Sequence, residues 1–369
     1  MLTKKMHNKR LASLVLIVFN CMIAQSQSQC RYHDSIFATA TSVNSVVYGK
    51  NINFADTVDL VMSIYRPDGD TQINRPAILL IHGGGFNTGN YVDPRVLEMC
   101  RLFAIRGYVA ASIEYRLYTE DPINYAAANY KAMQDAKAAI RFMRGNAATY
   151  GVDAQKIFIH GFSAGAFISN HAGYWDYDEV PDSLKTAYGD FEASGNPGIA
   201  DTVSGVMGWA GGIFDTTWLN NETVPWGSVH NTSDPLVDFW GSNGNYGSGS
   251  INQYRQNHLL PSSLRIVDIP GMHTPDMGTT EYNIFSSHSI DFFYDQLHTG
   301  CIVMHVSVAD GNWSDPAIWL GGVVPAATDR VTVRHNVFVT TNSTCYSLRV
   351  EQPAGNVIIG SGVNLIVTN

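Results

Sequence analysis

Basic residues are scarce in this sequence of 369 residues, which has 23 lysines and arginines against 32 aspartates and glutamates and a formal net charge of −9. This acidic balance argues against nucleic acid as a partner. The 5 cysteines form no CxxC pair and no cluster with histidines, so nothing suggests a metal site. After the N-terminal segment, no apolar run is long enough to span a membrane. The sequence has 45% hydrophobic residues, which is enough to form the buried core of one large domain or of two ordinary domains.

The N-terminal residues 1–26 have the features of a secretory signal peptide. A basic start is followed by an apolar run over 11–24 and by a small-residue exit at Ala24-Gln25-Ser26. The alternative, a membrane anchor, fits less well because the run is short and Asn20 interrupts it. We therefore expect a mature protein that starts near Gln27, is exported, and is soluble outside the cytoplasm without stable membrane insertion.

Export makes the cysteines informative, because disulfides persist in oxidising compartments. Cys30, Cys100, Cys301 and Cys345 remain after cleavage. A bridge from Cys30 to Cys100 would join the N-terminal arm to the body of the protein, and Cys301 has Cys345 as a candidate partner. The alternative for Cys100 is that it is simply a buried apolar residue on its helix.

The order of apolar patterns predicts an α/β fold. Residues 35–67 alternate polar and apolar positions, which predicts an antiparallel hairpin at a sheet edge. Beyond them, continuously apolar strands alternate with helical periodicity, which is typical of a mostly parallel sheet covered by helices on both faces. We expect strands at 77–81, 108–113, 157–162, 203–209, 224–229 and 264–269, and helices at 94–106, 125–144 and 283–297.

The strand beginning at Ile157 leads into Gly161-Phe162-Ser163-Ala164-Gly165, a GxSxG pattern followed by small helix-forming residues. This order predicts a strand, a very tight turn and a helix, with Ser163 at the apex of the turn in a strained backbone conformation. Side chains at Gly161 and Gly165 would collide across so sharp a bend. Ser163 is therefore the candidate nucleophile.

The sequence His82-Gly83-Gly84-Gly85-Phe86 follows the first buried strand directly. Successive glycines leave backbone N–H groups open to a ligand at the edge of the sheet where ligands bind. A phosphate-binding loop is the competing reading, but the Lys-Ser/Thr of a P-loop and the dinucleotide spacing are both missing. We predict an oxyanion hole formed by the N–H groups of Gly84, Gly85 and Ala164. His82 is interpreted as structural.

Residues from about 46 to 297 resemble an α/β-hydrolase of the carboxylesterase/lipase branch, similar to acetyl xylan and feruloyl esterases. The HGGGF and GFSAG segments carry this resemblance, together with segments 114–117 and 135–141. In that family the acid lies in a motif like HGxxDxxV, which residues 230–237 match with Asn231 in place of the glycine. The resemblance thus implies Asp234 as the acid, and His273, which follows the last strand, as the base.

The resemblance implies a Ser163-His273-Asp234 triad that works through an acyl-enzyme and needs no metal or organic cofactor. Other acids near strand ends fit less well by position, and the remaining late histidines are read as surface residues. The rival acids are Asp201, Asp215, Asp238 and Asp268, and the rival histidines are His258, His288 and His298.

The substrate is less well defined by the sequence. The irregular insertion 173–200 mixes aromatic residues with many charges, which suits a sugar-ester site better than an oil interface. The alternative for each aromatic residue is that it belongs to the core of the insertion. Residues 241–250 are predicted to be a flexible surface loop. An esterase acting on acylated plant polysaccharide is favoured; the alternatives are a lipase-like or polyester-degrading enzyme, a serine peptidase on this fold, and a non-catalytic binding protein.

Three segments are expected: the signal peptide at 1–26, the catalytic domain at 27–300 and a β-rich module at 301–369. The last segment has short Val/Ile/Thr strands separated by Asn, Gly and Pro, which is typical of the opening of a parallel β-helix or of a β-sandwich. It ends after a strand-like run, so it reads as incomplete. We assign it binding, spacing or secretion and no chemistry.

Overall fold

The computed structural model describes residues 30–120, 122–219, 224–242, 244–297, 304–319, 322, 324–327, 329–345, 347–350 and 355–367. The predicted signal peptide, Cys301 and His298 lie outside these ranges. Within them, no helix combines the length and the apolar character that crossing a membrane requires.

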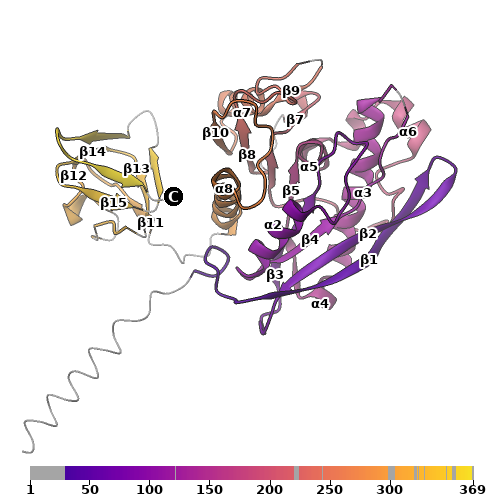
Figure 1. Cartoon of the computed structure of the whole chain (residues 1–369), viewed down its shortest axis with the longest axis horizontal. Helices are drawn as coiled ribbons and strands as arrows, with labels where there is room; N and C mark the ends of the chain where they lie inside the picture. The colour runs from indigo at the N-terminus through magenta and orange to yellow at the C-terminus, as the bar shows by residue number, and fades with distance from the viewer. Residues whose placement is uncertain are drawn as a thin grey trace, which may run out of the picture.

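An eight-stranded sheet of order β1-β2-β4-β3-β5-β6-β8-β10 forms the centre of the fold (Figure 1). β1 (Ala40–Asn53) and β2 (Asp56–Pro67) are the predicted edge hairpin, and β2 also runs antiparallel to β4. All other neighbours pair in parallel. The parallel strands are β3 (Arg75–Ile81), β4 (Val109–Ile113), β5 (Val152–Phe162), β6 (Val206–Trp209), β8 (Trp226–Asn231) and β10 (Ser262–Val267). The predicted α/β architecture is confirmed.

Helices cover both faces of this sheet because consecutive residues of its buried strands point to opposite sides. Ile78 and Leu80 of β3 pack in one apolar cluster with residues of α2 (Pro94–Ala104) and α8 (Thr280–Leu297). Leu79 and Ile81 pack in a second cluster with α3 (Tyr125–Gly145) and α5 (Ala164–Tyr174). The remaining helices are α4 (Ala147–Tyr150), α6 (Asp182–Tyr188) and α7 (Ser248–Asn257).

The N-terminal arm is attached by hydrogen bonds, and the predicted bridge between Cys30 and Cys100 is wrong. Cys100 is a free cysteine, fully buried in the apolar cluster beneath α2, and burial raises the pKa of its thiol well above the ordinary value. The arm is held instead by the Tyr32 amide, which donates to Arg106 O at 2.7 Å, and by Arg106 Nε, which donates to His33 O at 2.7 Å. The alternative reading of Cys100 as a buried apolar residue is therefore the correct one.

The prediction of a flexible loop over 241–250 is wrong for its second half. β9 (Tyr246–Gly247) pairs with β7 (Gly212–Ile213), and α7 begins at the next residue. Ser248 is fully buried, and the Gly249 amide donates to Phe239 O at 2.8 Å. Small residues that resemble a linker in sequence here permit close packing against the neighbouring backbone.

The C-terminal strands form short parallel ladders beside α8 (Figure 1). Arg330 anchors them there through ion pairs with Asp291 and Asp295 of α8. The parallel pairing matches the β-helix alternative and not an antiparallel sandwich. The three ladders are β11 (Met304–Val306), β13 (Arg330–Val333) and β16 (Ser347–Val350); β12 (Gly311–Asn312), β14 (Asn336–Val339) and β17 (Asn356–Ile359); and β15 (Ser343–Cys345) with β18 (Leu365–Val367).

Candidate active site

Ser163 lies between β5 and α5, at a turn that only small neighbours allow. Its backbone has φ 55° and ψ −119°, a conformation that costs a non-glycine residue about 1 to 3 kcal/mol. A Cβ added at Gly161 would lie 1.9 Å from Gly165 O, and one added at Gly165 would lie 2.3 Å from Ile81 O. The two flanking glycines are thus required by close backbone approach, as the sequence predicts.

The structure brings Ser163 together with the predicted base and acid. His273 Nε2 lies 2.7 Å from Ser163 Oγ, and His273 Nδ1 lies 2.7 Å from Asp234 Oδ2. The Asp234 side chain is fully buried, whereas that of His273 is 14% exposed. An Nδ1 proton held by the carboxylate leaves Nε2 free to accept the hydroxyl proton of Ser163. The three side chains therefore have the geometry that serine-based acyl transfer requires.

The Asp234 carboxylate is held by groups on every side. Oδ1 accepts hydrogen bonds from the amides of Leu236 at 2.8 Å and Val237 at 3.0 Å. On Oδ2, His230 Nε2 lies at 3.4 Å in addition to His273. Burial alone would raise the pKa of Asp234, but the hydrogen bonds from His230, His273 and the Val237 amide lower it well below the usual range. The carboxylate is therefore ionised at neutral pH.

The His230 side chain reaches Asp234 because a buried serine fixes its other nitrogen. Its Nδ1 lies 2.8 Å from Ser248 Oγ, and Ser248 Oγ in turn lies 2.8 Å from Ser228 Oγ. His230 Nε2 also donates to Val237 O at 3.0 Å. Nε2 faces two oxygens that can only accept, Val237 O and Oδ2 of the ionised Asp234, so the ring proton of His230 sits on Nε2. Sequence reasoning passed over this role, because the buried position of Ser248 was not recognised.

The predicted oxyanion loop lies directly against the nucleophile. A Cβ on Gly83 would come within 3.2 Å of Ser163 Cβ, and Gly84 has φ 115°, a conformation that other residues rarely adopt. The amides of Gly84 and Gly85 donate no hydrogen bond to another described residue. Ala164 is the first residue of α5, where backbone N–H groups lack partners within the helix. These donors are thus available beside Ser163.

His82 is buried beneath this loop, and its side chain is not hydrogen-bonded to Ser163. Its ring stacks on Tyr115 at 4.2 Å between ring centroids, Nδ1 lies 2.7 Å from Gly83 O, and Nε2 lies 3.2 Å from Glu114 Oε1. The segment that contains Glu114 is itself fixed, because Arg116 pairs with the buried Asp135 of α3. The two segments 114–117 and 135–141 therefore support the loop from below.

The rival acids and histidines of the described residues have other partners. Asp201 pairs with Lys137 and Arg141, Asp215 accepts from Thr217, Asp238 accepts from the amides of Trp240 and Gly241, and Asp268 accepts from Thr232 and Ser233. His258 Nδ1 bonds Tyr254 O, and His288 lies near Ser263. None of these side chains is hydrogen-bonded to Ser163 or His273.

The aromatic residues of the 173–200 insertion divide into two groups. Tyr174, Trp175 and Phe191 are buried and Tyr188 is half-buried against the same core, so for these four the alternative reading as local core holds, while Tyr177 is exposed. Nearer the nucleophile, the exposed Tyr125 packs edge-on against Phe86, the residue after the oxyanion loop, with 6.2 Å between ring centroids. Tyr125 thus offers a ring face beside the site.

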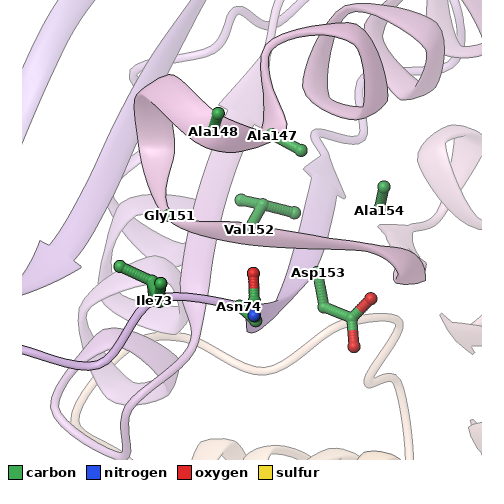
Figure 2. Close-up of a pocket in the computed structure, with 8 residues that line it drawn as sticks. All are labelled: Ile73, Asn74, Ala147, Ala148, Gly151, Val152, Asp153 and Ala154. Carbon is green, nitrogen blue, oxygen red and sulfur yellow. The ribbon is translucent and has the colours of Figure 1, made fainter.

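Two surface pockets differ in their relation to Ser163. One, of about 480 Å³, lies at the start of β5 and is lined by residues 147–148 and 151–154 with Ile73 and Asn74 (Figure 2). It is at the opposite end of β5 from Ser163 and lacks a nucleophile. The other, of about 530 Å³, is lined by residues 89–90, 92–95 and 276–277 and lies beside the loop that carries His273. Among the described residues, no cluster of His, Cys, Asp or Glu is arranged to hold a metal ion.

Comparison with known proteins places these features in a family context. Residues 62–243 match the family model BD-FAE, an esterase and feruloyl-esterase-like α/β-hydrolase domain. Esterase 2 of Thermogutta terrifontis has a similar structure, with a TM-score of 0.54 and 22% identity over 70% of this chain and 94% of that one. At this identity the likeness concerns the fold alone.

Curated relatives match shorter regions. Endo-1,4-beta-xylanase B of Butyrivibrio fibrisolvens is 26% identical over 60% of this chain and 34% of its own length. Carboxylesterase NlhH of Mycobacterium tuberculosis is 31% identical over 32% of this chain and 35% of its own length. The chain thus spans well under two thirds of each of these relatives.

Proposed function

We propose that this chain, whose residues 62–243 match an esterase family model on an α/β-hydrolase fold, hydrolyses carboxylic esters with Ser163 as nucleophile, His273 as general base and Asp234 as the orienting acid. The observation that supports this most strongly is the position of His273, whose two ring nitrogens lie 2.7 Å from Ser163 Oγ and 2.7 Å from Asp234 Oδ2.

The proposed reaction has two halves. Ser163 Oγ attacks the ester carbonyl carbon while His273 Nε2 takes the proton of the Ser163 hydroxyl. The negative oxygen of the tetrahedral intermediate accepts hydrogen bonds from the N–H groups of Gly84, Gly85 and Ala164. The intermediate collapses, the carbon–oxygen bond to the alcohol breaks, and His273 returns the proton to the leaving alcohol. Water, deprotonated by His273, then attacks the acyl carbon; the bond from that carbon to Ser163 Oγ breaks, His273 returns the proton to Oγ, and the acid is released.

Replacing the nucleophile tests this proposal. Ser163→Ala should lower kcat on a small aryl ester by about 10⁴- to 10⁶-fold, because the covalent step is lost while the fold remains. The matched control is Ser204→Ala, whose hydroxyl bonds Gln155 O far from the site and whose loss should leave kcat unchanged. Labelling by a phosphonate probe at a residue other than Ser163, located by mass spectrometry, would refute the assignment.

For the substrate, we propose acetyl or feruloyl esters of plant polysaccharides. The pocket beside the His273 loop carries Asn90, Asp93, Arg95 and Asp276, polar groups that can bind the hydroxyls of a sugar leaving group. The exposed ring of Tyr125 offers a stacking face for the aromatic ring of a feruloyl group. Charges also dominate the surface of the insertion: Asp176, Asp178, Glu179, Asp182, Asp190 and Glu192 are all exposed.

A hydrolysis panel separates this substrate class from the lipase-like or polyester-degrading alternative. Purified protein should release acetate or ferulate from acylated xylan fragments and should hydrolyse short-chain model esters far faster than long-chain triglycerides. Efficient cleavage of emulsified long-chain lipid, with no acid released from xylan, would refute the substrate class and leave the triad in place. Export is part of the proposal, and N-terminal sequencing of secreted protein should find a start near Gln27.

A further inference from the structure

Asn231 stands where the family motif has glycine, and its side chain links the two segments that carry the acid and the base. It is the last residue of β8 and is fully buried. Asp234 follows it by three residues along the chain. The neighbouring strand β10 runs parallel to β8, with Val267 in register with Asn231, and leads into the segment that ends at His273. The Asn231 side chain therefore lies between both catalytic loops.

The amide of Asn231 uses its full hydrogen-bonding capacity, which is two donated and two accepted bonds. Nδ2 donates to Ile269 O at 2.7 Å and to Met272 O at 2.6 Å. Oδ1 accepts from the Ile269 amide at 2.9 Å and from the Ser233 amide at 3.3 Å. The donors and acceptors around the side chain define which end is nitrogen, because the reversed amide would face carbonyl with carbonyl and N–H with N–H.

These four contacts reach both triad partners by short covalent paths. Met272 is the residue before His273, and Ser233 is the residue before Asp234. A glycine at position 231 would provide none of the four bonds. The base segment would then be joined to the acid turn by the His273–Asp234 bond itself and by backbone and hydroxyl contacts such as Thr232 N to Val267 O at 2.9 Å. We propose that Asn231 is a positioning residue that fixes the His273 loop relative to the Asp234 turn.

This inference rests on the proposed function, and it predicts a defect in chemistry without a defect in binding. Asn231→Gly should lower kcat about 10- to 100-fold with KM changed less than twofold, because a displacement of about 1 Å at a reacting group costs about 100-fold in rate. Asn231→Asp keeps an oxygen for Ile269 N and Ser233 N but cannot donate to Met272 O. It should lose kcat to a similar extent, which makes it the second test if the glycine variant folds poorly.

Asn196→Gly is the matched control. The Asn196 Nδ2 of the wild type also donates to two backbone carbonyls, Tyr48 O at 2.7 Å and Ala138 O at 3.2 Å, but Asn196 lies away from the triad. This variant should lose less thermal stability, because two hydrogen bonds are lost and glycine is favoured at the Asn196 backbone angle φ of 56°, and it should retain wild-type kcat. Both asparagines thus lose the same chemical group, and only one of the two losses should affect turnover.

A double-mutant comparison distinguishes positioning from general loosening. In a His273→Ala background, Asn231→Gly should leave the residual hydrolysis of an activated aryl ester unchanged, because the residue through which Asn231 acts is gone. Equal losses in both backgrounds would overturn the inference in favour of a structural role. Wild-type kcat in both Asn231 variants would overturn the inference alone, whereas an inactive wild-type protein would overturn the proposed function as well.

Discussion

Replacing Asp234 by asparagine removes one charge and almost no volume, and the surrounding donors determine how the new amide must lie. The amides of Leu236 and Val237 point at Oδ1, at 2.8 and 3.0 Å. The asparagine oxygen must take that position, since an NH₂ group there would face two N–H donors. The NH₂ group is then directed at His273 Nδ1, 2.7 Å from the present Oδ2. His273 must accept there and carry its proton on Nε2, from which it cannot act as a base for Ser163.

The expected cost of Asp234→Asn is therefore a loss of about 10⁴-fold in kcat, the magnitude that a wrong histidine tautomer produces in serine triads. This corresponds to about 5.4 kcal/mol of lost transition-state stabilisation. The assay is steady-state hydrolysis of an aryl acetate. The control is Asp238→Asn, because Asp238 accepts hydrogen bonds from the amides of Trp240 and Gly241 in the same kind of turn but is not hydrogen-bonded to a histidine. A loss below about tenfold would refute the assignment of Asp234.

The same variant has a pH signature in stability. The pKa of Asp234 is lowered in the folded protein, so its stabilisation is fully present above the ordinary aspartate pKa of about 3.9 and is lost as the pH falls through the folded value. The part of the difference in unfolding free energy between the wild type and Asp234→Asn that comes from this carboxylate should therefore shrink below about pH 4. A difference that grows on acidification would contradict this sign.

Three further predictions concern other residues. Gly165→Ala should lower the unfolding free energy by about 1 to 3 kcal/mol or more in urea titrations, because its Cβ would lie 2.3 Å from Ile81 O; a variant as stable as the wild type would contradict the close approach. Cys100 should resist thiol reagents in the native protein and react only after unfolding, since it is fully buried with a raised pKa; rapid native labelling would disprove this. Tyr125→Ala should raise KM for a feruloyl ester about 2- to 10-fold and leave KM for an acetyl ester unchanged, because only the aromatic acyl group stacks on its ring; equal changes for both esters would argue against stacking.

The parts of the site that follow from local sequence were predictable. The glycine at position 161 depends on neighbouring residues alone, because the clash that excludes larger side chains there comes from Gly165, four positions away, whereas Gly165 is required by the close approach of Ile81 O on β3. The register of parallel strands brings the ends of β5, β8 and β10 to one edge, which is why an expected strand order suffices to place Asp234 and His273 there.

Contacts between distant segments were not predictable from the sequence. The reach of His230 toward Asp234 depends on Ser248, whose surroundings read as a flexible linker although the residue is buried. Asn231 attracted notice only as a departure from the family motif, since its four partners lie up to 41 positions away. The prediction of a Cys30–Cys100 bridge was wrong for a related reason. Export to an oxidising compartment allows disulfides to form, but it does not determine which cysteine side chains lie close together.

The strained backbone of Ser163 has a consequence for how this position can change over time. At φ 55° and ψ −119° a glycine has less backbone strain than a serine, so selection for folding stability alone should favour glycine at this position. A serine kept at this position is therefore explained by the function of its hydroxyl and not by the stability of the fold. A homologue with glycine at this position and an intact surrounding turn would therefore mark a lineage released from hydrolysis, and its domain should unfold at a higher temperature than the same domain with serine restored.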